Sequence, residues 1–129
     1  MVLAEDHAGV AEQLRNLLAT EFDVVATVTD GLALVRAVEA MRPDVVVADI
    51  VMPGMDGIAA TEALLALRPD TRVVLATVHN DPELMERGYA GGALACVSKH
   101  RAGQDLLPAV RAAMRGERYV GSGVRNGKG

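Results

Sequence analysis

The sequence predicts an α/β fold in which a parallel β-sheet is covered by helices on both faces. Short apolar runs alternate with amphipathic segments five times along the 129 residues, which is typical of parallel sheets with helical crossovers. The run at residues 44–49, Asp-Val-Val-Val-Ala-Asp, has no polar alternation, as expected of a strand buried on both faces. Half of the residues are apolar, which is enough for one packed core in a single domain.

The strands are predicted from short runs that are apolar or rich in β-branched residues and that end at turns or polar residues. The first run, Met1 to Ala4, is followed at once by two acids. Pro43 precedes the third run, and the turn-rich segment 52–57 follows it. We therefore expect five strands, at residues 1–4, 22–28, 44–49, 71–77 and 93–98.

The first two helices are predicted from apolar residues that recur at helical spacing on a polar background. The first helix is expected at about residues 7–20, and the second begins after Asp30, which can cap it, and stops before Pro43. Their apolar faces are expected to be formed by Val10, Leu14, Leu17 and Leu18 in the first helix and by Leu32, Val35, Val38 and Met41 in the second.

Three further helices follow the later strands. One runs from Ile58 to Leu67, and Pro69 ends it. The next begins at Asp81-Pro82-Glu83, where an N-cap residue precedes a proline and an acid, and it continues to about Tyr89, before Gly91-Gly92. The last helix ends at Gly116, and its apolar positions are Leu106, Leu107, Val110, Ala113 and Met114.

Five strands that alternate with helices are most often arranged in the order 2-1-3-4-5, the flavodoxin-like order of doubly wound sheets. We expect one domain over residues 1–118. The chain is rich in Gly, Ser and Lys from residue 121 onward, so residues 119–129 are predicted to be a flexible C-terminal tail or the start of a linker.

Composition excludes several classes of function. The net charge of −4 argues against nucleic-acid binding by this domain, because phosphate contacts require a basic face. The single cysteine, Cys96, cannot form an internal disulfide, which favours a reducing compartment. No apolar run is long enough to span a membrane, so we expect a cytoplasmic protein without membrane contact.

Polar side chains occur where the predicted strands end. In open α/β sheets, ligands bind beyond the carboxyl ends of the strands, and the expected strand order brings four of these ends to one crevice. The residues at these positions are Glu5, Asp6, Asp49, Thr77 and Lys99. We take Asp49, at the end of the most apolar strand, as the centre of the chemistry.

The three acids of this set predict a magnesium site. Carboxylates within a few ångströms repel one another unless a cation joins them. Oxygen ligands completed by water suit Mg²⁺, and the sequence has no His/Cys cluster for zinc. Asp6 and Asp49 are the expected direct ligands, Glu5 would act through water, and the backbone carbonyl of Val51 would complete the protein's share.

A carboxylate beside Mg²⁺ can act as a nucleophile toward phosphorus and form an aspartyl phosphate, which is the role we assign to Asp49. The ammonium group of Lys99 would neutralise charge on the phosphoryl oxygens during the transfer. The Thr77 hydroxyl would bind a phosphoryl oxygen only while that group is present, so the modification would move Thr77 and act as a switch.

The sequence resembles a bacterial response-regulator receiver domain from residue 1 to about residue 116. The resemblance rests on an acid pair, on an acid at the start of Asp-Ile-Val-Met-Pro-Gly-Met-Asp-Gly and on two polar residues further along the chain. These residues are Glu5, Asp6, Asp49, Thr77 and Lys99. The resemblance implies that Asp49 accepts a phosphoryl group from a histidine kinase, with Mg²⁺ required. It also implies that the protein is no enzyme beyond its own phosphorylation and dephosphorylation, and that Pro53 and Gly57 shape the loop behind the acceptor.

Three short segments are similar to the NarL/LuxR-type subgroup, whose receivers usually precede a helix-turn-helix. They are Ala-Glu-Asp-His, Gly-Gly-Ala and Arg-Gly-Glu-Arg-Tyr-Val, at residues 4–7, 91–93 and 115–120. The resemblance implies a role in transcription regulation if such a domain follows in the full protein, with DNA contacted only through that C-terminal domain. We also predict a homodimer through the last helix or through the face around the fifth strand.

Two other functions compete with this interpretation. A pseudo-receiver, which is an interaction module that is not phosphorylated, is kept open by Cys96, because the family usually has Tyr or Phe there. His100 is a second departure, since Pro or Asp usually follows the lysine. A phosphatase of the haloacid-dehalogenase kind would also use a strand-end Asp and Mg²⁺, but Asp49 is followed by Ile50 and Val51, so the second acid of Asp-x-Asp is missing.

Overall fold

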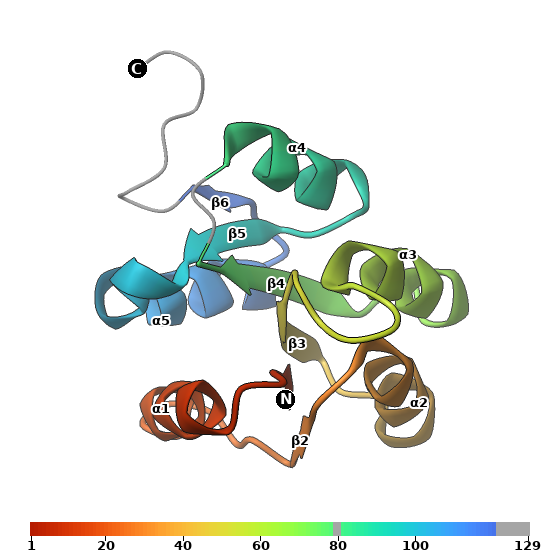
Figure 1. Cartoon of the computed structure of the whole chain (residues 1–129), viewed down its shortest axis with the longest axis horizontal. Helices are drawn as coiled ribbons and strands as arrows, with labels where there is room; N and C mark the ends of the chain where they lie inside the picture. The colour runs from red at the N-terminus through yellow and green to blue at the C-terminus, as the bar shows by residue number, and fades with distance from the viewer. Residues whose placement is uncertain (79–80, 121–129) are drawn as a thin grey trace.

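The computed structural model describes residues 1–78 and 81–120. One sheet forms the middle layer of an α/β/α sandwich, and Figure 1 shows helices on both of its faces. The order of strands in the sheet is β2-β1-β3-β4-β5-β6, and every neighbouring pair is parallel. The flavodoxin-like α/β class and the order 2-1-3-4-5 of the first five strands are therefore confirmed.

The prediction of five strands was wrong, because a sixth strand lies at the edge beside β5. The strands are β1 Val2–Ala4, β2 Ala26–Val28, β3 Val45–Asp49, β4 Arg72–Thr77, β5 Ala95–Ser98 and β6 Tyr119–Val120. The chain turns back after the last helix at Gly116, whose φ of 74° is in the left-handed region that favours glycine. Two residues give no readable alternation, so the pattern of the sequence could not reveal β6.

The helices are α1 Ala8–Leu18, α2 Gly31–Met41, α3 Gly57–Leu67, α4 Pro82–Ala90 and α5 Ala102–Met114, and a short 3₁₀ helix, η1, covers Lys99–Arg101. Asp30 and Asp81 cap α2 and α4 as predicted, with side chains that accept from the backbone N–H groups of Ala33 and Glu83 at 2.8 and 3.0 Å. Asp56 caps α3 in the same way. These caps show why local sequence located the helix starts well.

The predicted apolar face of α2 was partly wrong. Leu34 and Val38 are fully buried, whereas Leu32 and Met41 are 47% and 52% exposed. Leu34 and Val38 are four residues apart and therefore lie on one side of the helix, against the sheet. Leu32, Val35, Val38 and Met41 have equally good helical spacing, so spacing alone could not select between the two sets.

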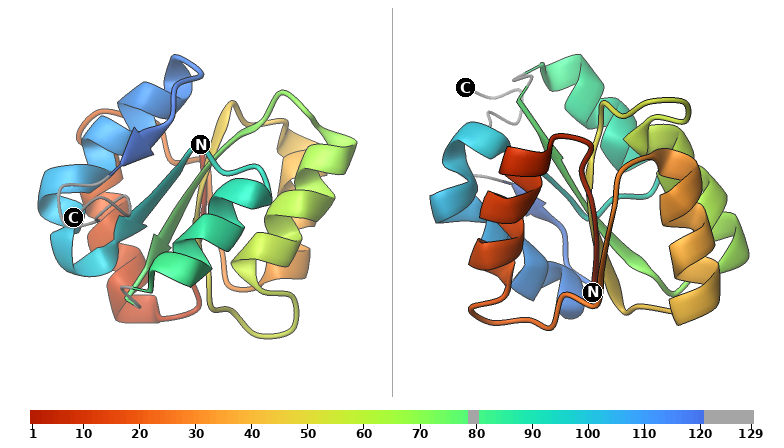
Figure 2. Two further views of the ribbon diagram at one scale, coloured as in Figure 1. Left: turned by 90° about the horizontal axis from the view of Figure 1, so that it is seen from above. Right: turned by 60° about the horizontal axis from the view of Figure 1, so that its bottom comes forward.

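The apolar core is divided into two parts by the sheet, and successive residues of each central strand point to opposite parts. One part joins α2, α3 and α4 to the sheet, and the other joins α1 and α5 to it. The two views of Figure 2 show these helix layers on either side of the strands. All five residues of β3 are buried, as predicted for a strand covered on both faces.

The second strand is shorter than predicted, because residues 22–25 are not part of it. The N–H of Phe22 donates to the carbonyl of Leu18 at 2.8 Å, so this residue closes the end of α1 and packs into the core from there.

Within residues 1–78 and 81–120, no helix has the length and apolar character needed to cross a membrane. The predicted tail is described only up to Val120, and its remainder, residues 121–129, lies outside the described residues.

Candidate functional site

Three acids meet at the carboxyl ends of β1 and β3. Ala4 and Ala48 are partners in the parallel register, so Glu5 and Asp49, the residues that follow them, lie side by side. One carboxylate oxygen from each of Glu5, Asp6 and Asp49 lies within 4.8 Å of the others. Glu5 and Asp49 are buried, with 1% and 8% of their surfaces exposed, whereas Asp6 is exposed. The convergence that the sequence predicted for these acids is therefore present.

Lys99 places a positive charge between two of these acids. Its Nζ donates to Asp49 Oδ2 at 2.8 Å and to Glu5 Oε1, so residues that are far apart in the sequence form one ion-paired cluster. Burial alone would lower the pKa of the Lys99 ammonium, but hydrogen bonds and charge from Asp49 and Glu5 outweigh it and raise that pKa above its usual value. Lys99 is therefore a cation at any physiological pH.

The remaining oxygens of the two buried acids accept hydrogen bonds from the backbone. The N–H of His7 donates to Glu5 Oε2 at 3.1 Å, and the N–H of Val51 donates to Asp49 Oδ1 at 3.2 Å. Each buried carboxylate thus has a donor at both oxygens, which offsets the free-energy cost of burying its charge. Sequence reasoning missed the contact between Glu5 and Lys99, since it assigned Glu5 to the metal alone.

Two glycines hold the loop that follows β3. A Cβ on Gly57 would lie 2.1 Å from the backbone oxygen of Asp49, and a Cβ on Gly31 would lie 2.1 Å from the backbone oxygen of Met55. The N–H of Gly57 also donates to the carbonyl of Ile50 at 2.7 Å. Only a residue without a side chain fits at either place, so the starts of α2 and α3 fix the loop behind the acid.

Thr77 and Ser98 are the last residues of β4 and β5 and lie at the same end of the sheet as the acids. Asp49 is the register partner of Ala76, so Thr77 is one residue beyond the acid's neighbour, and it is fully buried opposite Ser98. The side chain of Ser98 accepts from the N–H of His100 at 3.2 Å and caps η1, the short helix that begins with Lys99. Sequence reasoning did not assign a role to Ser98, because a serine at a strand end is ordinary.

An open groove reaches the site from the side of α1 and α5. Its wall includes Lys99 and the exposed side chain of Val78, together with Val10, Leu14, Leu17 and His100. This groove leads from the surface to the lysine that contacts Asp49.

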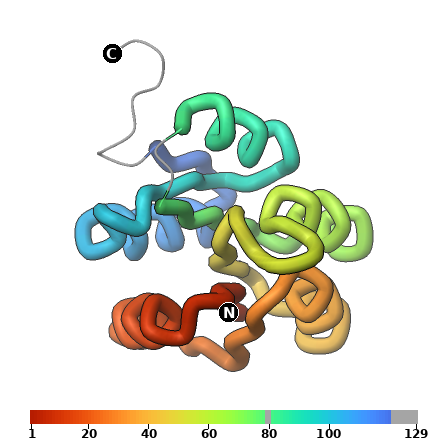
Figure 3. Tube along the Cα trace, viewed as in Figure 1, coloured from red at the N-terminus to blue at the C-terminus, as the bar shows by residue number. Residues whose placement is uncertain are grey.

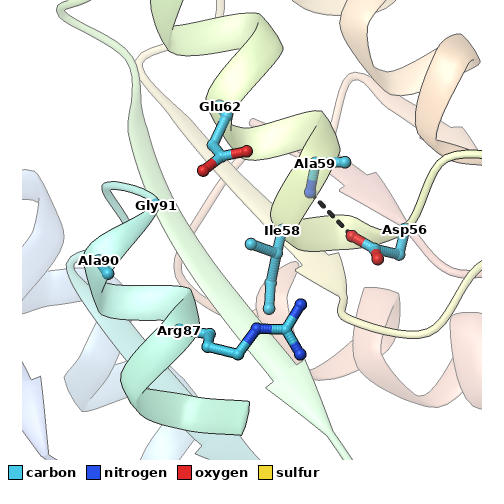
Figure 4. Close-up of a pocket in the computed structure, with 7 residues that line it drawn as sticks. All are labelled: Asp56, Ile58, Ala59, Glu62, Arg87, Ala90 and Gly91. Carbon is cyan, nitrogen blue, oxygen red and sulfur yellow. Dashed lines mark hydrogen bonds between the residues drawn. The ribbon is translucent and has the colours of Figure 1, made fainter.

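A second depression lies between α3 and α4 and is separate from the acids. Figure 4 shows the side chain of Arg87 extending toward Ile58, with Asp56 on the other side of the opening. Asp56 already accepts the N–H of Ala59 at 2.8 Å as the cap of α3. The residues that form this depression do not include any member of the cluster around Asp49, so the two features are distinct.

This sheet topology and the acid–lysine cluster define the class of receiver domains. Residues 1–111 match the family model described as the response regulator receiver domain, and the chain belongs to this family. Within the family, it is close to the NarL/LuxR-type response regulators by both sequence and structure. The resemblance inferred from the sequence is therefore confirmed.

Known relatives support this placement. The chain is 32% identical over 123 residues to the oxygen regulatory protein NreC of Staphylococcus aureus, and the match covers 93% of this chain but only 57% of NreC. The signal receiver domain of the response regulator NarL from Mycobacterium tuberculosis matches with a TM-score of 0.85 and 29% identity, over 90% of this chain and 95% of that one. A LuxR-family two-component response regulator from Aurantimonas sp. SI85-9A1 matches with a TM-score of 0.89 and 29% identity, over 95% and 88%.

Proposed function

We propose that this receiver domain works by phosphorylation, with Asp49 accepting a phosphoryl group from a histidine kinase. One observation carries the proposal: the Asp49 carboxylate lies 2.8 Å from the Lys99 ammonium and within 4.8 Å of two further acids. A cation and an acid cluster around one carboxylate are what phosphoryl transfer to an aspartate requires. The match to the receiver family adds independent support.

The transfer is a displacement at phosphorus. An oxygen of Asp49 forms a bond to the phosphorus atom as the bond from phosphorus to the histidine nitrogen breaks, and that nitrogen keeps the electron pair. Lys99 then moves its ammonium group from the carboxylate to a phosphoryl oxygen, where it stabilises the transferred charge. The hydroxyl of Thr77, one residue beyond the strand partner of Asp49, binds another phosphoryl oxygen.

The donor set around Asp49 fits Mg²⁺. The candidate ligands are oxygens, and the exposed side of Asp6 leaves room for the water molecules that Mg²⁺ keeps. Asp6 and Asp49 would bind the ion directly, the carbonyl of Val51 would add a third ligand, and Glu5 would act through water. When bound, the ion supplies positive charge that offsets the repulsion between the acids and the incoming phosphoryl group.

The protein would not turn over a substrate beyond its own acyl phosphate. A phosphatase of the haloacid-dehalogenase kind needs an acid two residues after its nucleophile, and that position is occupied by Val51. The domain therefore acts as a phosphoacceptor that loses its phosphoryl group to water. The exposed groove beside Lys99 is where we place the contact with the kinase, and the cytoplasm is where we place the exchange.

The output is proposed to be transcriptional. The chain spans 57% of the length of NreC, and its relatives include a protein described as LuxR-family. The net charge of −4 argues against DNA binding by this domain, so contact with DNA would belong to a helix-turn-helix domain elsewhere in the full protein. A homodimer through α5 or through the face around β5 would bring two such domains together.

A pseudo-receiver is the second candidate, and Cys96 favours it. The position that usually carries an aromatic residue holds a fully buried thiol, so the rotation of an aromatic ring at this position cannot report phosphorylation. Such a protein would present the same fold to partners without modification. The two candidates differ in whether Asp49 is labelled.

Incubation with acetyl phosphate and Mg²⁺, followed by intact-mass measurement, tests the proposal. The wild-type protein should gain one phosphoryl group per chain, and Asp49→Asn should gain none while remaining folded. Asp44→Asn is the matched control, because Asp44 is an exposed acid just before β3, at the opposite end of the strand that ends in Asp49. Absence of a mass gain in the wild-type protein, or a gain that persists in Asp49→Asn, would refute the proposal; release of phosphate in many turnovers would indicate an enzyme instead.

A further inference from the structure

The edge strand β6 is attached to the sheet by few backbone contacts. The N–H of Tyr119 donates to the carbonyl of Leu94 at 2.9 Å, and the register places Tyr119 opposite Ala95 and Val120 opposite Cys96. The trace in Figure 3 shows this segment beside β5, at the end of the described chain. A strand of two residues has little backbone stabilisation of its own, so side chains decide whether it stays paired.

Tyr89, the penultimate residue of α4, provides such a side chain. Its hydroxyl donates to the carbonyl of Tyr119 at 2.7 Å and accepts the N–H of Cys96 at 3.2 Å. In a parallel pair with this register, the N–H of Cys96 and the carbonyl of Tyr119 face each other across the two strands. The hydroxyl contacts both groups of this step of the ladder, so a single oxygen atom joins α4, β5 and β6.

Two further side-chain contacts hold the same segment. The guanidinium carbon of Arg118 lies 4.3 Å from the centre of the Tyr89 ring, a cation–π arrangement. The hydroxyl of Tyr119 donates to Asp105 Oδ1 at 3.1 Å, and Asp105 is a buried residue of α5. The segment is thus attached to α4 through Tyr89 and Arg118, and to α5 through the side chain of Tyr119.

The same helix is packed tightly against β5, which leads to the acid cluster. A Cβ on Gly88 would lie 2.8 Å from the sulfur of Cys96 and 2.9 Å from Leu75 Cδ1. The helix α4 therefore approaches the sheet so closely at Gly88 that only a residue without a side chain fits there. Cys96 is three residues before Lys99, whose ammonium contacts Asp49. A continuous chain of contacts therefore runs from the acid through β5 to Tyr89.

We propose that the hydroxyl of Tyr89 is a latch that holds β6 to α4 and β5, and that a phosphoryl group on Asp49 opens it. The second half rests on the proposed function. When Lys99 turns from the carboxylate to a phosphoryl oxygen, the end of β5 shifts, and a hydroxyl that spans three elements is sensitive to a relative movement of any two. The signal leaves the domain as a change in the pairing of residues 118–120. Tyr89 would thereby report phosphorylation in place of the aromatic residue that the family usually has at the position of Cys96.

Amide hydrogen exchange of Tyr119 and Cys96, measured residue by residue, tests the latch without phosphorylation. Tyr89→Phe keeps the ring under Arg118 and removes only the hydroxyl, so both amides should exchange about tenfold faster, as expected for the loss of about one hydrogen bond. Tyr119→Phe is the matched control, because it removes the contact with Asp105 and leaves the Tyr89 hydroxyl in place; its Cys96 amide should exchange as in the wild type. Wild-type rates in Tyr89→Phe would overturn the latch.

The same measurement after treatment with acetyl phosphate and Mg²⁺ tests the opening. Exchange at Tyr119 should rise in the wild type and in Tyr119→Phe, and it should not rise further in Tyr89→Phe, whose latch is already open. Complete labelling by intact mass with unchanged exchange at Tyr119 would overturn the opening and leave the proposed function standing. Failure of labelling would overturn the proposed function, and the opening with it, whereas the unphosphorylated comparison would still decide the latch.

Discussion

Lys99 and Asp49 form a buried ion pair, with 2.8 Å between Nζ and Oδ2 and only 9% of either side chain exposed. The ammonium also donates to Glu5, so one lysine offsets the charge of two buried acids. The lysine that we propose to assist phosphoryl transfer therefore also holds the carboxylates of Asp49 and Glu5 in place in the absence of a phosphoryl group. A substitution of Lys99 should therefore affect both the folding stability of the protein and the proposed transfer.

Replacement of Lys99 by methionine should destabilise the protein strongly and in a way that Mg²⁺ partly reverses. The change leaves two buried carboxylates without their cation, and breaking a buried ion pair by removing one partner costs about 3 kcal/mol or more. A divalent cation can take the place of the ammonium, so the loss of unfolding free energy should be smaller with Mg²⁺ than with a chelator.

Chemical denaturation of the wild type and of Lys99→Met, each with Mg²⁺ and with a chelator, measures the effect. Arg111→Met is the matched control, because Arg111 is paired with Glu21 on the exposed surface, where removing a partner costs little. Equal losses in the two variants, or a loss that Mg²⁺ does not change, would contradict the assignment of Lys99 to the centre of the acid cluster.

Asp6 should be required for stabilisation by Mg²⁺. It is the exposed member of the acid cluster, and of the two carboxylates proposed as direct ligands it is the one that is not paired with Lys99. The wild-type free energy of unfolding should rise with Mg²⁺ concentration, reaching about 2.7 kcal/mol at one hundred times the dissociation constant. Asp6→Asn should lose this dependence over the same range. Asp70→Asn should behave as the wild type, because Asp70 is an exposed acid just before β4, at the end of the strands opposite to the acid cluster.

A methyl group at Gly57 should be much more costly than one at Gly9. The Cβ of Gly57→Ala would lie 2.1 Å from the backbone oxygen of Asp49, so the loop or the strand must shift, at a cost of about 2 kcal/mol. Gly9 lies in α1 with open space around its Cβ position, so Gly9→Ala should stabilise the helix by up to about 1 kcal/mol. Thermal unfolding of both variants measures the contrast. Similar midpoints would show that the loop behind Asp49 is not rigid.

The thiol of Cys96 should make stability depend on alkaline pH. Burial raises its pKa to about 12, from an ordinary value of 9.0. The native state therefore keeps a proton that the unfolded state releases above about pH 9, so this contribution to stability is complete below pH 9 and falls as the pH rises toward 12. Denaturation across this window should show a shallower decline in Cys96→Ala. Tyr89, Tyr119 and Lys99 also have raised pKa values, so the difference between the two proteins isolates the thiol. Parallel slopes would contradict the burial of a titrating thiol.

Much of the site was predictable because strand ends in a parallel sheet face the same edge. Asp49 and Lys99 could be placed near one another from the sequence alone, since each follows an apolar run and the strand order sets the carboxyl ends of β3 and β5 on either side of β4. The helix starts were also readable, because Asp30 and Asp81 carry cap chemistry that acts within three residues. Local rules worked wherever the deciding contact was local.

The parts that could not be predicted depend on contacts between distant segments. Glu5 pairs with Lys99 across 94 positions, and no local feature distinguishes that acid from Asp6. The strand β6 depends on a hydroxyl from α4, thirty positions earlier than Tyr119. Leu32 and Met41 fit a helical stripe as well as the residues that are buried, and only the position of the neighbouring elements decides which side faces inward.

The contact of Gly31 with Met55 has a consequence for mutational surveys of this protein. Gly31 has no reactive group and lies at the start of α2 rather than on β3, yet any side chain there would push on Met55 in the loop that also carries Val51. A saturation scan scored by loss of signalling would rank this glycine beside the aspartate it supports. A strong loss of signalling in such a scan could therefore come from a steric clash as well as from the loss of a reactive group. Separate assays of folding and of labelling would tell the two causes apart.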